Sequence, residues 1–172
     1  DGTTPLEMDQ MVVNFSMREG LTWADGTPLT AEDSVYAFTL AGDKNSIANS
    51  YLLERTEIYE ATDAQNLQWW GKPGFIDPAY FTNFWDPAPK HLWNEFTASQ
   101  LPTNDSARRK PMGWGPYKID EWIAGDHITL SKNPYYFRAA EGLPKIDDVS
   151  FRFIANPDVA ISELVAGRCD II

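Results

Sequence analysis

The sequence has 172 residues, of which 43% are hydrophobic, so one domain or a compact pair of subdomains can bury an apolar core. Its 25 acidic and 14 basic residues give a net charge of −11, which argues against nucleic acid and anionic membrane surfaces as partners. The single cysteine, Cys169, excludes an intrachain disulfide, and we expect it to be a small buried hydrophobe. We expect no signal peptide within these 172 residues, and their apolar runs are too short to span a bilayer.

The first predicted element is a half-buried strand. Val13, Phe15 and Met17 alternate with polar residues, which is typical of a strand with one face in the core. Downstream, the pair Asp25-Gly26 predicts a tight turn, because glycine adopts positive φ angles without steric cost. The sequence therefore predicts a strand that turns sharply before the next element.

A helix is expected directly after this turn. Thr30 and Asp33 have the spacing of a capping box, with Asp as a shorter substitute for the usual Glu or Gln. Apolar residues then recur at helical spacing, which predicts a helix over residues 31–41 with one buried face. A second, short helix is predicted over residues 45–53, where Ile47 contributes to an apolar face.

The middle of the chain predicts a strand pair and then short helices. Residues 56–61 and 66–70 indicate two strands around a turn-rich tetrad. Pro78 and Pro89 occupy plausible helix starts, because proline is tolerated at the first helical position. Residues 99–111 are polar and contain two prolines, so they are the best candidate for a linker or subdomain boundary.

The C-terminal part predicts a hairpin followed by a strand–helix–strand unit. Residues 117–130 alternate on either side of a turn, and residues 149–153 indicate a further strand. Asn156 should cap a helix that ends before Gly167, and residues 169–172 should resume as a strand. The two strands of this βαβ unit should be parallel, with a right-handed crossover. We therefore expect an α+β fold with a mixed β-sheet, flanking helices and a C-terminal βαβ unit.

Four segments, taken in order, resemble the family 5 extracellular solute-binding proteins, which are the peptide- and nickel-type receptors of ABC importers. Each is weak alone, but together they cover most of the chain. Trp114 is a departure, because most members are expected to have threonine there. The segments are GLTWADGTPLTAED (20–33), MGWGPYKI (112–119), GDHITLSKNPYY (125–136), and PKIDDV (144–149) with LVAGRCDI (164–171).

The resemblance implies a fragment of a two-lobed fold that closes on its ligand. Residues 1–105 would be part of the accessory subdomain of the first lobe, and residues 106–172 part of its main sheet, truncated near the hinge. Because the sequence begins and ends abruptly, we expect any export signal or lipid anchor to lie outside it. Membrane contact would then occur only through such an anchor.

The resemblance also implies a binding protein rather than an enzyme, without a cofactor. Such a receptor would work in the periplasm or at the extracellular face of the membrane and deliver its ligand to an ABC permease. Oligopeptides are the default ligand class by resemblance, while oligosaccharides and nickel complexes stay open. The ligand-gripping residues would mostly lie beyond this fragment.

Two residues are candidate ligand contacts. Trp114 lies between two glycines, where a bulky ring has little local cover, so it either faces the cleft or packs inside. Tyr51 lies where the resemblance loosely suggests a ligand-facing aromatic. Other tryptophans could form an aromatic floor, but the core interpretation is favoured because large aromatic side chains usually pack inside. These are Trp69, Trp70, Trp85 and Trp93.

The sequence gives little support to other chemistry. The two histidines, His91 and His127, belong to no metal-binding spacing, so we expect no metal site, and His127 should be solvated in its hairpin turn. No Gly-x-Ser-x-Gly elbow occurs. The basic run 108–110 is adequately explained as a solvated loop. Two alternatives stay open: a secreted carbohydrate-active hydrolase domain, which needs two facing carboxylates, and a carbohydrate-binding module, which needs coplanar exposed tryptophans.

Overall fold

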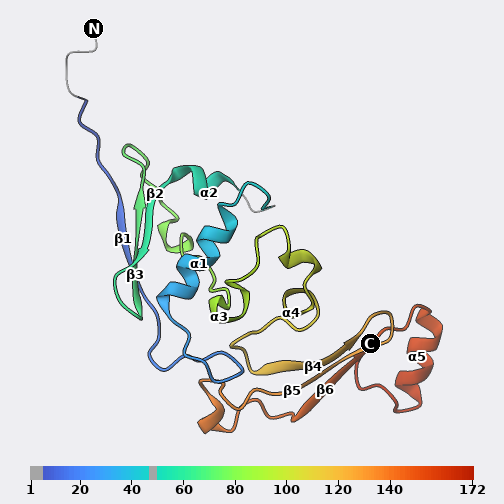
Figure 1. The fold of residues 1–172 in the computed structure, drawn as a ribbon. Helices are drawn as coiled ribbons and strands as arrows, with labels where there is room; N and C mark the ends of the chain where they lie inside the picture. Colours follow the sequence, from blue (N-terminus) through green and yellow to red (C-terminus); the bar gives the residue numbers. More distant parts are fainter. Residues whose placement is uncertain (1–5, 47–49) are drawn as a thin grey trace.

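The computed structural model describes residues 6–46 and 50–172 and contains two three-stranded sheets joined by short helices (Figure 1). Within each sheet, every strand pair is antiparallel. The first sheet has the order β1-β3-β2, formed by Val12–Ser16, Asn66–Gly71 and Thr56–Ala61. The second has the order β4-β5-β6, formed by Tyr117–Ile123, His127–Lys132 and Asp148–Arg152.

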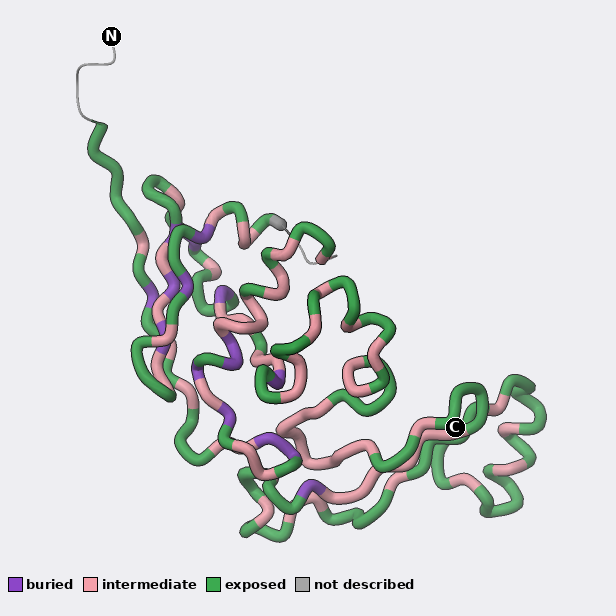
Figure 2. The backbone as a smooth tube through the Cα atoms, viewed as in Figure 1, coloured by how far each residue is buried: buried purple, intermediate pink, exposed green. Residues whose placement is uncertain are grey.

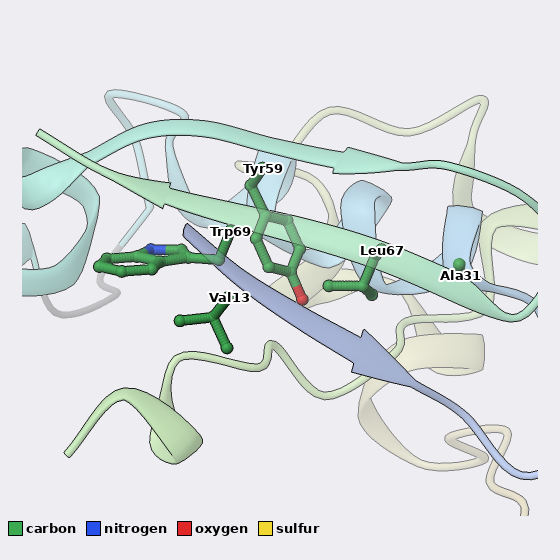
Figure 3. Packing of buried hydrophobic residues seen from close by; sticks show 5 residues of the cluster. All are labelled: Val13, Ala31, Tyr59, Leu67 and Trp69. Atoms are coloured by element: carbon green, nitrogen blue, oxygen red, sulfur yellow. The ribbon is translucent and has the colours of Figure 1, made fainter. Parts of the chain in front are cut away.

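The core lies on one face of the first sheet, where α1 (Ala31–Ala41) covers it. Figure 3 shows Val13, Tyr59, Leu67 and Trp69 projecting from the three strands near Ala31 of α1. The register aligns Val13 and Tyr59 on either side of Trp69, so these side chains stack across the sheet. The Trp69 ring is fully buried, and its Nε1–H donates to Thr56 Oγ1 at 2.8 Å.

The helix predicted over residues 31–41 is confirmed to the residue as α1. The backbone N–H of Thr30 donates to Asp33 Oδ2 at 2.9 Å, which is the reciprocal half of a capping box. The next helix, α2, spans Ser50–Arg55, so it overlaps the end of the predicted range 45–53 and extends two residues beyond it. Ile47, to which we assigned a place on that helix, lies outside the described residues.

Short helical turns fill the connection between the two sheets. They are η1 (Tyr80–Thr82), α3 (Lys90–Trp93), η2 (Leu101–Thr103) and α4 (Asp105–Arg108). The last two fall within the predicted linker 99–111, so this polar segment has local helical structure. The first sheet lies before residue 105 and the second after it, while the division into two subdomains stays a prediction. Among the described residues, the helices are all too short or too polar to span a bilayer.

The second sheet begins with the predicted hairpin, whose turn contains Gly125 at a φ of 79°. η3 (Ala139–Glu141) lies between β5 and β6. The helix α5 (Pro157–Val165) then starts at the predicted cap, where Asn156 Oδ1 accepts the backbone N–H of Asp158 at 2.9 Å. Gly167 follows the helix with a φ of 67°. This part of the sequence pattern is therefore confirmed.

Two details of the predicted architecture are wrong. Each described sheet is antiparallel rather than mixed, and residues 169–172 form no strand, so the βαβ unit lacks its second strand. A strand is stable only with a hydrogen-bonded neighbour, and an apolar run does not supply one. Ile171 and Ile172 are instead 85% and 61% exposed. The α+β class with flanking helices is confirmed.

Candidate functional site

Three segments that are far apart in the sequence meet where the two sheets join. The backbone N–H of Ala24 donates to the carbonyl of Gly113 at 2.9 Å. Thr22 Oγ1 donates to the carbonyl of Tyr135 at 3.1 Å, and Asn133 Nδ2 donates to the carbonyl of Gly115 at 2.9 Å. The turn after β1 is thereby fixed to the segment before β4 and the segment after β5, at the open end of the β4–β5 hairpin.

The turn itself depends on Gly26. Its φ of 88° lies in the left-handed region that favours glycine, and Trp23 N–H closes the loop by donating to the Thr27 carbonyl at 2.8 Å. A Cβ atom at Gly26 would lie 2.8 Å from Cζ of Tyr135, because the tyrosine ring packs directly on the glycine. The Asp25-Gly26 pair therefore provides both the turn and the space for a contact between distant segments.

Inside this turn, the Trp23 ring is wholly buried, with 0% of its surface exposed. Its Nε1–H donates to Asp33 Oδ2 at 3.2 Å, so the one polar atom of the ring has a partner. The ring packs edge-to-face against Trp114, with a centroid distance of 5.3 Å and an interplanar angle of 83°. A second aromatic contact, to His91, has a centroid distance of 6.0 Å.

An open hollow of about 290 Å³ lies beside Trp114. This volume is at the lower end of the ~300–1,000 Å³ range of small-molecule sites, so it suits one part of a larger ligand. Seven of its eight lining residues are apolar, and none is charged. The lining residues are Phe15, Ser16, Met17, Leu21, Leu29, Phe84, Pro87 and Trp114.

The two candidate ligand residues lie in different places. Trp114 is half-buried and forms part of the wall of the hollow, while its ligand contact stays a prediction. Tyr51 lies on α2, at the opposite end of α1 from the start of β4 (Figure 1). Its half-exposed ring is stacked under the guanidinium of Arg55, whose Cζ is 3.7 Å from the ring centroid. The structure does not bring Tyr51 to the hollow.

The remaining tryptophans do not form a shared aromatic floor. The floor interpretation is wrong for Trp69, because its ring is sealed in the core of the first sheet. Trp70 alternates to the other face of β3 and is half-buried. Trp85 packs against the core through Phe38, with a centroid distance of 5.7 Å. None of these rings lines the hollow beside Trp114.

Both histidines pair with carboxylates. His91 Nε2 lies 2.9 Å from Asp25 Oδ2. Partial burial raises the pKa of Asp25, but hydrogen bonds from the Thr27 backbone and from His91 outweigh this, and the net pKa is lowered. His127 hydrogen-bonds to Asp126 at 2.8 Å and to Glu121 at 3.2 Å, so it is not simply solvated. The hydrogen bond to Asp126 is the main reason that the pKa of His127 is raised.

Within the described ranges, His, Cys, Asp and Glu side chains form no group of three or more that could hold a metal ion. Cys169 is half-buried rather than buried, and it lies just beyond α5. No carboxylate lines the hollow, so this site lacks the acid and base that hydrolysis of a glycoside requires. An uncharged, open and mostly apolar hollow is typical of a binding surface.

Comparison with known sequences places the chain in a family of binding proteins. The family of bacterial extracellular solute-binding proteins, family 5 (Middle), matches over residues 6–172. The chain therefore belongs to this family. A similar curated relative is the oligopeptide-binding protein AppA of Bacillus subtilis, which is 29% identical over 164 residues.

Solved structures share the fold. A structure of Bacillus subtilis AppA in complex with a nonapeptide superposes with a TM-score of 0.78 at 27% identity, covering 93% of this chain. A mannohexaose-bound periplasmic oligopeptide-binding protein from Thermotoga maritima superposes with a TM-score of 0.74 at 27% identity, covering 91%. The chain spans only 29% to 31% of the length of these proteins.

Proposed function

We propose that this chain is part of the first lobe of an extracytoplasmic solute-binding receptor. The receptor would capture an oligopeptide-like ligand between two lobes and deliver it to the permease of an ABC importer. The family match over residues 6–172 and the oligopeptide-binding relatives support this proposal. The role is capture rather than catalysis, at the periplasmic or extracellular face of the membrane.

The observation that carries the proposal is the hollow beside Trp114. A large flat ring offers much apolar contact area at a low cost in conformational entropy. The wall in which Trp114 stands also contains Phe15 and Phe84, and it has no charged residue that would require pairing. The hollow therefore suits an uncharged, apolar part of a ligand.

The mechanism follows from the two-lobed architecture of the proposed receptor. Ligand bound to the first lobe would favour the closed arrangement, because only that arrangement adds contacts from the second lobe. Closure excludes water and presents one defined surface to the permease. Trp114 would act in the first of these steps, as a preformed wall.

The molecules bound in the solved structures of relatives suggest two ligand classes for this receptor, peptides and oligosaccharides. The Bacillus subtilis structure contains a nonapeptide and the Thermotoga maritima structure contains mannohexaose, at the same 27% identity to this chain. An oligopeptide ligand is favoured, because curated relatives of this chain are named oligopeptide-binding or peptide-binding proteins. An oligosaccharide would also stack on an exposed tryptophan face, so it is the second class to test.

The test is ligand binding by the receptor that carries this chain. Peptides and oligosaccharides are screened by thermal shift, since a ligand of the folded state raises the unfolding midpoint by mass action. For the ligand found, Trp114→Ala should raise the Kd about tenfold or more. Trp70→Ala is the matched control, because it removes a half-buried tryptophan outside the hollow.

Equal Kd values for the two variants would contradict the proposal that Trp114 contacts the ligand. Turnover of a glycoside or peptide without any thermal shift would contradict the proposal that the protein is a solute-binding receptor. Binding of an oligosaccharide alone would keep the receptor and change its ligand class.

A further inference from the structure

We infer that Asp33 is a positioning residue for the binding wall: it fixes Trp23, and Trp23 in turn fixes Trp114. The inference rests on the proposed function, because it takes the hollow beside Trp114 to be a ligand site. Asp33 itself does not line that hollow, so its effect on binding would be indirect. Asp33 belongs to the first turn of α1, and by sequence it is only a capping residue. The structure gives it two further connections.

The carboxylate of Asp33 joins three segments of the chain. Oδ2 accepts the backbone N–H of Thr30 at 2.9 Å and the ring N–H of Trp23 at 3.2 Å. Oδ1 accepts the backbone N–H of Lys90, 57 residues away, at 3.3 Å. Asp33 is only 5% exposed, so water cannot easily replace these bonds. Hydrogen bonds to an ionised carboxylate are also the stronger kind.

Trp23 transmits this anchoring to Trp114 by two routes. Its buried ring contacts the Trp114 ring edge-to-face, with a centroid distance of 5.3 Å. Its neighbour Ala24 donates a backbone hydrogen bond to the Gly113 carbonyl, which directly precedes Trp114. The ring and the backbone of Trp114 are thus both held by the turn that Asp33 anchors.

Loss of the carboxylate would leave Trp23 Nε1–H buried without an acceptor. Such a donor carries its full desolvation cost, so the ring is expected to move until it finds a partner. Trp114 would then lose its edge contact and become mobile in the wall of the hollow. A ligand must then order that ring when it binds, and this ordering weakens the affinity.

Two adjacent positions of α1 allow a matched test. Asp33→Ala removes the anchor of Trp23. Ser34→Ala removes an equally buried polar side chain, whose hydroxyl hydrogen-bonds to the Tyr59 hydroxyl and the Trp85 carbonyl on the core side. Both variants are expected to lower the unfolding temperature. Only Asp33→Ala should disturb Trp114.

The first readout is the ¹⁹F NMR spectrum of the receptor labelled with 5-fluorotryptophan, in which Trp114→Phe assigns the Trp114 resonance. Asp33→Ala should shift or broaden that resonance, and Ser34→Ala should leave it unchanged. The second readout is the Kd for a nonapeptide with apolar side chains. Asp33→Ala should raise this Kd about tenfold, and it should add nothing in a Trp114→Ala background.

An unchanged Trp114 resonance in Asp33→Ala would overturn the inference. If Asp33→Ala does not fold, Trp23→Phe replaces the indole with a smaller ring that has no N–H and so breaks the same link, and a shift of the same resonance is expected. Failure of the proposed function has a different signature. In that case no nonapeptide binds, or Trp114→Ala leaves the Kd unchanged. The ¹⁹F resonance of Trp114 then decides by itself whether Asp33 positions that ring.

Discussion

The two sheets of this chain differ in how they are held together. The buried apolar side chains of the described residues lie between Val13 and Pro89 in the sequence, around the first sheet and the segments beside it. Over residues 106–172, the only buried residue is Asn133, which is polar. Figure 2 shows this difference as purple backbone around the first sheet and an almost wholly pink and green second sheet.

The comparison separates what alternation predicts from what it does not. Val13 and Phe151 stand in strands with the same alternating pattern, yet Val13 is 8% exposed and Phe151 is 55% exposed. The pattern identifies the face that a strand can bury, whereas burial requires a covering layer. The first sheet has α1 as that layer, and the second sheet is open in this chain.

The second region depends on polar connections instead. Asn133, just after β5, is linked to the segment before β4 by two hydrogen bonds, to the carbonyls of Pro116 and Gly115. Glu163 links β6 to the end of α5 through two arginines. Exposed apolar residues flank these links, as is typical of surfaces that contact other protein. They include Ile123, Phe151, Phe153, Val159, Ile161, Leu164 and Val165.

The largest effect is expected from the core of the first sheet. Trp69→Ala should lower the free energy of unfolding by ~3–5 kcal/mol, because it opens a cavity in a packed core and leaves the Thr56 hydroxyl without its ring partner. Chemical denaturation measures this loss. Trp70→Ala, one residue along the same strand, should cost much less, since that ring is half-buried on the other face. Similar losses for both would contradict the one-sided core.

A smaller effect is expected from the polar hub of the second region. Asn133 is 1% exposed, and its side chain accepts from the Tyr135 N–H and donates to the Gly115 carbonyl, both at 2.9 Å. Asn133→Ala should cost ~1–3 kcal/mol, because both partners lose a buried hydrogen bond. Asn133→Asp tests the donor alone: it retains the acceptor for Tyr135 but places a buried carboxylate oxygen against the Gly115 carbonyl, so it should be no more stable than Asn133→Ala near neutral pH. A stability close to that of the unsubstituted protein in the same denaturation experiment would contradict the bond to Gly115.

Local signals made most of the first region predictable. Thr30 and Asp33 defined the start of α1, and Asp25-Gly26 defined the turn, because each depends on residues a few positions apart. The strand predicted over 169–172 failed for the opposite reason. A strand needs a neighbour, and apolar composition alone does not place one.

The candidate site was only partly predictable. The glycines on either side of Trp114 indicated little local cover for its ring, and the half-buried ring lines an open hollow, while its contact with a ligand stays a prediction. The further roles of Asp33 were missed, since the bond to Lys90 spans 57 residues and the bond to Trp23 runs backwards along the chain. Hydrogen bonds of that kind arise from tertiary packing, for which a single sequence has no periodic signal.

The smallest effect is a pH-dependent one, at the link between β6 and α5. The carboxylate of Glu163 accepts from Arg168 Nη2 at 2.7 Å and Arg152 Nη1 at 3.1 Å. These bonds, that to Arg168 first, lower the pKa of Glu163 from 4.5 to about 2. Because the folded pKa is the lower one, the link stabilises the protein above pH 4.5 and loses its effect as the pH falls towards about 2.

Glu163→Gln should therefore lower the thermal unfolding midpoint slightly at about pH 6, and the difference from the unsubstituted protein should disappear on acidification. Added salt should reduce it, because the arginines are largely exposed. Glu141→Gln is the matched control, since Glu141 hydrogen-bonds to one arginine, Arg138, where Glu163 bonds to two, and its effect should be smaller. If the difference between the two unfolding midpoints persists unchanged near pH 2, Glu163 acts through its packing rather than through its charge. The second region would then depend less on polar links than the comparison of the two sheets indicates.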